Sequence, residues 1–89
     1  MSMTLVVSDQ NGKWLIYPLV VQIQREDGEV LVSEPHFYMH AVGPTVAEAI
    51  AEFKRILVDE LQQLEYDEKR LGPRLKKQLQ YLRSIIRMA

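Results

Sequence analysis

The chain has 89 residues, of which 47% are apolar, so it is long enough for one small domain and too apolar for an intrinsically disordered protein. It contains no cysteine, which excludes disulfides and thiolate metal sites and is typical of a reducing compartment, so we expect a cytoplasmic protein. No apolar run reaches the roughly 18 residues of a membrane span, and the N-terminal residues lack the pattern of a signal peptide. We therefore expect no membrane contact.

The formal net charge of −1 conceals an uneven distribution of charged residues. Residues 1–68 contain four Lys/Arg and twelve Asp/Glu, whereas residues 69–89 contain seven Lys/Arg and no acid. This division predicts an acidic body followed by a basic segment. The basic segment could contact nucleic acid, an acidic partner, or the acidic body of a second copy of the chain.

The first half of the chain has the pattern of β-strands. Residues 3–7 and 14–24 are β-prone runs on either side of the turn-forming pair Asn11-Gly12, which predicts a hairpin. Within the second run, residues 21–24 alternate between Val or Ile and Gln, as in a half-buried antiparallel strand.

Two further strands are predicted before the chain becomes helical. A turn at Arg25–Gly28 leads into a strand over residues 29–33, which Pro35 ends. The aromatic, β-prone residues 36–42 then predict a returning strand.

A long helix is predicted over residues 45–66. Thr45 and Glu48 have the spacing of a capping box, in which each side chain satisfies a backbone N–H group of the first helical turn. One face of this helix is apolar, at Val46, Ala49, Ile50, Phe53, Leu57, Leu61 and Leu64.

A second helix is predicted over residues 73–88, after a break at Gly72-Pro73. Because the first helix already covers a small sheet, we expect the apolar stripe of the second helix to pack against another copy of the chain or a partner protein. The residues of this predicted oligomer interface are Leu75, Leu79, Leu82 and Ile86.

These elements predict an α+β fold: a small antiparallel sheet of three to four strands, covered by a long helix and followed by a second, C-terminal amphipathic helix. Residues 1–89 would form a single domain, with a β-β-β-α core over residues 1–66 and the basic helix over residues 73–88.

Part of this pattern resembles the HicB family of antitoxin-like domains, over about residues 14–61. The resemblance lies in the acidic turn Glu26-Asp27-Gly28, a strand ending at Pro35, and the helix start Gly43-Pro44-Thr45-Val46-Ala47-Glu48-Ala49. The family usually has an acid directly after the proline and a glycine shortly after that, and this chain has His36 and no such glycine. The resemblance implies a small α+β domain that pairs with an RNA-cleaving toxin.

No pattern of a catalytic or metal site is present. The two histidines, His36 and His40, would lie about 13 Å apart on a strand, too far for one metal ion, and no third ligand accompanies them. The serines lack a nucleophile-elbow context and no phosphate-binding glycine loop occurs. We therefore expect no enzyme, no metal and no cofactor.

The basic C-terminal segment is the main candidate for a functional contact. Its cations border both sides of the apolar stripe, which favours a solvated or self-complementary role over nucleic-acid binding. The leading hypothesis is a non-enzymatic HicB-like partner of a small, basic, RNA-cleaving toxin. The alternatives are a homo-oligomeric interaction module and a nucleic-acid-binding regulator. The candidate contact residues are Arg70, Arg74, Lys76, Lys77, Arg83 and Arg87.

Overall fold

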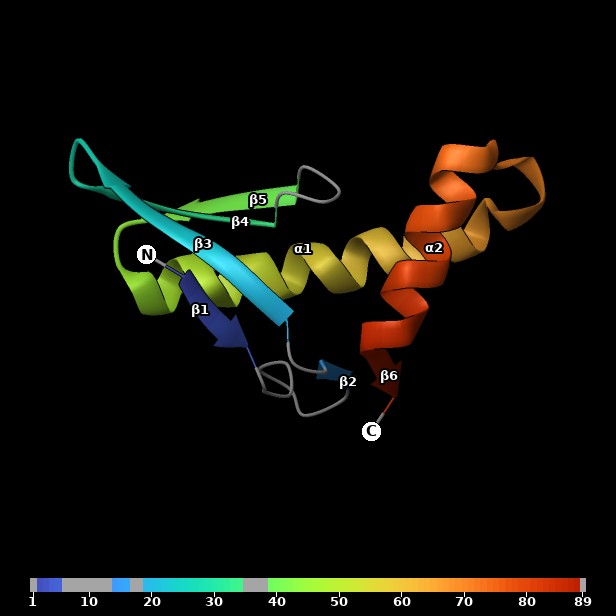
Figure 1. Cartoon of the computed structure of the whole chain (residues 1–89), viewed down its shortest axis with the longest axis horizontal. Coiled ribbons are helices and arrows are strands. Elements are labelled where there is room, and N and C mark those ends of the chain that lie inside the picture. The colour runs from blue at the N-terminus through green and yellow to red at the C-terminus, as the bar shows by residue number, and fades with distance from the viewer. Residues whose placement is uncertain (1, 6–13, 17–18, 35–38, 89) are drawn as a thin grey trace.

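The computed structural model describes residues 2–5, 14–16, 19–34 and 39–88 (Figure 1). The chain forms strands first and helices second, as the sequence predicts, with one short strand after the last helix. The elements are β1 (Ser2–Leu5), β2 (Trp14–Ile16), β3 (Leu19–Glu26), β4 (Glu29–Glu34), β5 (Met39–Gly43), α1 (Val46–Tyr66), the 3₁₀ turn η1 (Glu68–Arg70), α2 (Pro73–Ile85) and β6 (Ile86–Met88).

The main sheet is antiparallel, with the strand order β1-β3-β4-β5. A two-residue turn joins β3 to β4, because Glu26 pairs directly with Glu29. Both turn residues have positive φ, 49° at Asp27 and 77° at Gly28, as a tight hairpin between right-twisted strands requires. The α+β class and the antiparallel sheet predicted from the sequence are therefore confirmed.

The N-terminal run is divided differently from the prediction. β1 pairs with β3, with Leu5 opposite Leu19, so the two predicted apolar runs are indeed neighbours. Residues 14–24, however, do not form one strand, because residues 14–16 form β2, which pairs with β6 in a separate two-stranded sheet. The predicted turn at Asn11-Gly12 lies outside the described residues.

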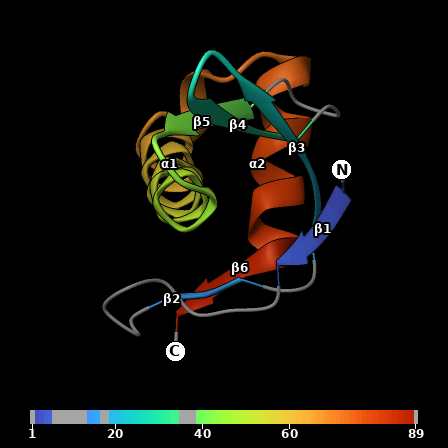
Figure 2. The same cartoon turned by 90° about the vertical axis from the view of Figure 1, so that its left-hand side faces the viewer.

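Helix α1 begins where the capping box predicts. Thr45 is the N-cap in an extended conformation, and its Oγ1 accepts a hydrogen bond from the backbone N–H of Glu48 at 3.1 Å. The first half of α1 packs beneath β4 and β5, and Figure 2 shows β3 and β1 continuing the sheet to one side. The buried side chains of α1 are Ala49, Phe53, Leu57, Val58, Leu61 and Leu64.

A close contact fixes the start of α1 against the end of β5. A Cβ atom placed on Gly43 would lie 2.7 Å from the backbone nitrogen of Ala49, which is closer than real Cβ contacts allow. Glycine at position 43 therefore lets the helix approach the strand.

Helix α1 extends past the sheet, and α2 packs across its C-terminal half (Figure 1). Leu71, Leu79, Leu82, Ile85 and Ile86 join the same buried cluster as the sheet and α1. In the described part of the chain, no helix combines the length and the apolar character that a bilayer span needs.

Two expectations for the second helix were wrong. The helix ends at Ile85, and residues 86–88 form β6. The apolar stripe of the second helix is already covered within the single chain. Leu79, Leu82 and Ile86 are each at most 3% exposed, and Leu75 is partly buried against the same core. The physical reason is that the end of α1 beyond the sheet has its own apolar surface, and α2 covers it.

Candidate functional site

The basic residues of the C-terminal segment are spread over three elements. Lys69 and Arg70 are exposed in η1, and Arg87 is exposed on β6. The others lie on α2, where all are exposed at the surface: Arg74, Lys76, Lys77 and Arg83.

Arg83 differs from the other basic residues because it is bound to two carboxylates of its own chain. Its Nη1 and Nη2 donate to the two Glu68 carboxylate oxygens at 3.1 and 2.8 Å, and its Nε donates to Glu65 at 3.2 Å. These hydrogen bonds raise the pKa of Arg83, and the bond from Arg83 lowers the pKa of Glu68. Arg83 therefore links α2 to the end of α1 and to η1, and its charge is largely neutralised.

A further polar contact links α2 to α1. The Gln78 side-chain amide donates to the carboxylate of Glu60 at 3.1 Å, in a partly buried position between the two helices. Tyr81 is partly buried, and this burial, together with the negative charge of Glu34, raises the pKa of Tyr81. Glu34 lies at the end of β4 and is only 2% exposed. Tyr81 is thus a packing residue, partly buried against the core.

Glu34 is a residue that the sequence analysis did not single out. It is the one charged side chain found buried among the described residues. The alternation in β4 contains the relevant pattern, because Val30 and Val32 face the core and position 34 must face the same way. A carboxylate at an inward position is the observation that would have drawn attention to it.

We use the term basic surface for five of the remaining cations, which lie on η1 and α2: Lys69, Arg70, Arg74, Lys76 and Lys77. All five are exposed, and none forms an ion pair within the described part of the chain. Three of them lie on α2, which has no acidic residue. Of the predicted contact residues, Arg70, Arg74, Lys76 and Lys77 are therefore exposed charges without an ion pair in the described residues. Arg83 is bound within its own chain, and Arg87 is exposed on β6.

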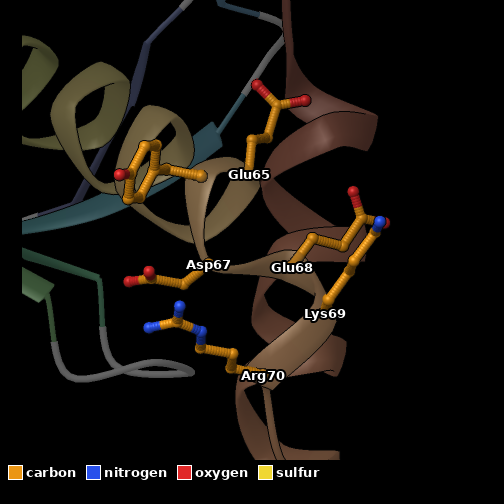
Figure 3. Close-up of a pocket in the computed structure, with 6 residues that line it drawn as sticks. Glu65, Asp67, Glu68, Lys69 and Arg70 are labelled. Atoms are coloured by element: carbon orange, nitrogen blue, oxygen red, sulfur yellow. The ribbon is translucent and has the colours of Figure 1, made fainter.

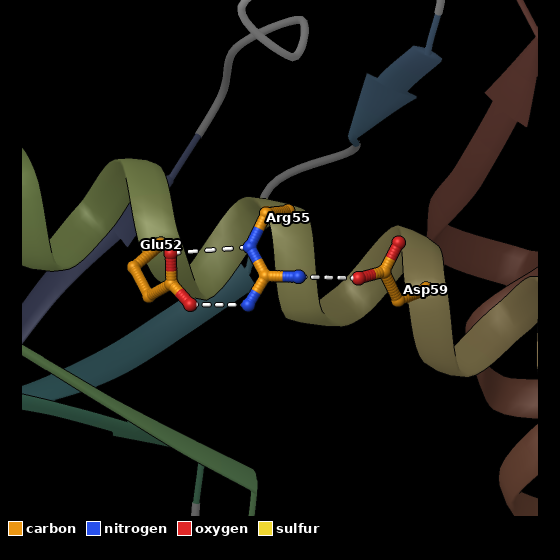
Figure 4. Close-up of polar contacts among 3 residues, drawn as sticks. All are labelled: Glu52, Arg55 and Asp59. Atoms are coloured by element: carbon orange, nitrogen blue, oxygen red, sulfur yellow. Dashed lines mark hydrogen bonds and ion pairs between the residues drawn. The ribbon is translucent and has the colours of Figure 1, made fainter.

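The acidic counterpart lies on the exposed side of α1. Arg55 donates from Nε to Glu52 at 3.1 Å and from Nη1 to Asp59 at 2.5 Å, with a second contact from Nη2 to Glu52 (Figure 4). The hydrogen bond from Arg55 lowers the pKa of Glu52, and the same bond raises the pKa of Arg55. Two carboxylates share one guanidinium, so this stretch keeps a negative balance.

The acidic surface continues to the other end of the sheet. The β3–β4 turn exposes Glu26, Asp27 and Glu29, and Glu48 is exposed in the first turn of α1. None of these four carboxylates has an ion-pair partner in the described residues. We use the term acidic surface for Glu26, Asp27, Glu29, Glu48, Glu52 and Asp59.

An open hollow lies where α1 meets η1, and Figure 3 shows its lining. It is formed by the consecutive residues 65–70, which include both acidic and basic side chains. Tyr66, one of these residues, is 87% exposed. Its carboxylates Glu65 and Glu68 are bound to Arg83. The hollow therefore has the composition of a solvated helix end rather than of a ligand pocket.

No candidate metal site emerges from the described residues. They contain no group of three or more His, Asp or Glu side chains placed to hold a metal ion. His40 is exposed on β5, and His36 lies outside the described residues.

Comparisons of the chain with protein-family models, with curated proteins and with solved structures find no match.

Proposed function

We propose that this chain is a non-enzymatic, HicB-like binding protein, the antitoxin-type partner that covers a small, basic, RNA-cleaving toxin. The observation that carries the proposal is the acidic surface, which extends from the β3–β4 turn along α1. Its six carboxylates outnumber the two exposed cations beside them, Arg25 next to the turn and Arg55 between Glu52 and Asp59. A protein that binds RNA needs a basic surface for the phosphates, and an acidic surface of similar extent competes with RNA for it.

Two structural features support the resemblance on which the proposal also rests. The acidic turn Glu26-Asp27-Gly28 joins two neighbouring strands, and the Thr45–Glu48 cap begins the helix that covers them. Both motifs therefore occupy structural positions that suit the β-β-β-α arrangement implied by the resemblance.

The test begins with purification of the protein at native levels from its own cell, with and without nuclease. The proposal expects a stoichiometric small basic protein that stays bound after nuclease treatment. That protein, purified alone, should cleave RNA, and addition of this chain should stop the cleavage. A co-purifying protein without RNA-cleaving activity, or a chain that leaves cleavage unchanged, contradicts the proposal.

Charge variants locate the contact on the acidic surface. Glu29→Gln and Glu48→Gln each remove an exposed, unpaired carboxylate with little change of shape, so they should weaken binding of the basic protein and reduce its salt dependence. Lys77→Gln on α2 is the matched control, because it removes one exposed charge of the opposite sign. Equal weakening by all three variants would contradict a contact at the acidic surface.

The alternative function, a nucleic-acid-binding regulator, has one observation in its favour. The basic surface has five exposed cations without ion-pair partners in the described residues. Under this alternative, RNA or DNA would co-purify in a nuclease-sensitive form, and Lys77→Gln would weaken binding in a salt-dependent manner. Nuclease-resistant association with a protein partner decides in favour of the first proposal.

A further inference from the structure

The face of the main sheet that points away from α1 has an unusual composition. Side chains alternate along the strands, and Val21, Ile23, Val30, Val32 and Ala41 are buried on the inner face. The outer face of the sheet, as far as its side chains are described, consists of Val20, Gln22, Gln24, Leu31, Ser33, His40 and Val42.

The described side chains of this outer face include no acid, lysine or arginine between the strand ends, although 26% of the chain is charged. Its acids, Glu26 and Glu29, lie at the end where the β3–β4 turn begins. Val20 and Val42 are 56% and 45% exposed, and Leu31 lies beside Val42 in the register of β4 and β5. A surface without cations does not bind nucleic acid, and depletion of charge is characteristic of the centre of a protein interface.

We propose that the outer face of the sheet is the contact surface of a two-fold symmetric homodimer, in which the sheet of one copy packs face to face on the sheet of a second copy. In such a dimer each surface patch meets the same patch of the other copy. An uncharged patch meets its equivalent without electrostatic repulsion. The absence of such repulsion is therefore a condition that the contact surface of the dimer must satisfy.

The two charged surfaces fail that condition. The acidic surface placed against itself would bring carboxylates such as Glu48 and Asp59 near their equivalents, and the basic surface would do the same with Lys76 and Lys77. A contact between the acidic surface of one copy and the basic surface of the next is attractive, but it closes into a pair only if both such contacts form at once across one two-fold axis; a single contact of this kind builds open chains or rings. The outer face of the sheet permits a closed pair through one contact.

The orientation of the two copies also follows from charge. If the two-fold axis runs across the strands in the plane between the sheets, the β3–β4 turns of the two copies lie at opposite ends. This arrangement separates the acids Glu26, Asp27 and Glu29 of one copy from those of the other. The other in-plane axis, parallel to the strands, would place these turns side by side.

The size of the face is sufficient for a modest dimer. Four strands spaced about 4.8 Å apart and about five residues long give a face of roughly 19 by 17 Å. Covering one such face on each copy removes on the order of 1,000 Å² from water, near the lower end of specific protein interfaces. The dimer should therefore dissociate on dilution, so its dissociation constant is measurable.

Sedimentation equilibrium of the full chain tests the proposal. The unaltered chain should show a monomer–dimer equilibrium without larger species. Val42→Lys and Gln24→Lys, two exposed outer-face positions on different strands, should each raise the dissociation constant at least tenfold, because symmetry brings two new charges together. Gln62→Lys on the exposed side of α1 is the matched control and should leave the constant unchanged.

A second measurement uses the absence of cysteine from the chain. Ser33→Cys puts a single thiol near the middle of the face, and Gln62→Cys puts one outside it. A short bifunctional thiol reagent should join two copies of the first variant and not of the second. A chain that is monomeric up to about 0.2 mM overturns the proposal, as do lysine variants at positions 24 and 42 that dimerise like Gln62→Lys.

Discussion

Gly43 occupies the junction between the last strand of the sheet and the first turn of α1. The added Cβ of Gly43→Ala would meet the Ala49 backbone at 2.7 Å, so helix and strand must move apart. We expect a loss of about 1–3 kcal/mol in the free energy of unfolding, the usual cost of overpacking. Urea unfolding followed by circular dichroism measures this loss.

Gly72 provides the control for this substitution. It has φ of −75°, and a Cβ added there meets nothing within 4 Å. Gly72→Ala should therefore leave the free energy of unfolding within about 0.5 kcal/mol of the original value. Equal effects of the two substitutions would contradict a specific contact at Gly43.

At the level of single residues, the sequence predicts local geometry well and contacts at a distance poorly. The Thr45–Glu48 spacing predicts the cap, because both groups belong to one helical turn. The Gly43–Ala49 contact involves two elements whose angle no local pattern specifies. Arg83 is a similar case, since its partners Glu65 and Glu68 precede it by more than a dozen residues.

At the level of elements, the length of α1 explains the position of α2. A helix of 21 residues is about 32 Å long, whereas a strand of six residues such as β4 spans about 20 Å. About a third of α1 therefore extends beyond the sheet, with Leu61 and Leu64 on its apolar side. The projecting end of α1 therefore needs a cover of its own, in addition to the cover that the sheet needs.

Burial of α2 in its own chain predicts the effect of a core substitution. Leu82 is 0% exposed, so Leu82→Ala removes atoms that are fully buried in one chain and should cost about 2–5 kcal/mol of unfolding free energy. Gln80→Ala, on the exposed side of the same helix, is the control and should have a small effect. If Leu82→Ala costs no more than the control, α2 is not packed as described.

The ion pairs of Arg83 predict a dependence on pH. The pKa of Glu68 is lowered from 4.5 in the folded chain, so its contribution to stability is present above the unfolded pKa and is lost as pH falls through the folded pKa. The stability difference between the original chain and Arg83→Gln should therefore be largest near neutral pH and shrink as the pH falls below about 4.5. Urea unfolding at a series of pH values measures it.

The corresponding control is Lys77→Gln, which removes an exposed cation without an ion pair in the described part of the chain. The difference in unfolding free energy between the original chain and Lys77→Gln should not shrink as Glu68 becomes protonated. A difference for Arg83→Gln that grows towards low pH would contradict the assigned pairs, since protonated Glu68 no longer benefits from the guanidinium.

At the scale of the whole molecule, charge is divided among surfaces that suit different contacts. The acidic surface spans the β3–β4 turn and α1, and the basic surface spans η1 and α2. The described side chains on the outer face of the sheet, between the strand ends, are uncharged. The division between acidic and basic residues is visible in the sequence, because it follows chain order. The uncharged face becomes visible only when β3, β4 and β5 are placed in register.

The pairing of β6 with β2 connects the C-terminal residues to a segment near the N-terminus, with Ile16 opposite Ile86. No local pattern predicts it, because residues 86–88 continue the apolar period of the helix before them and their partner lies far away in the sequence. Ile86 is 3% exposed, so this strand contributes a buried side chain as well as backbone hydrogen bonds.

Removal of residues 86–89 therefore tests whether the molecule depends on this closing strand. The shortened chain loses the burial of Ile86, which is worth about 1.5–3 kcal/mol, together with the partner of β2, so its free energy of unfolding should fall by at least that amount. Removal of Ala89 alone is the control and leaves β6 intact. If both truncated chains unfold at the same urea concentration, β6 does not stabilise the fold, which contradicts the pairing of β6 with β2.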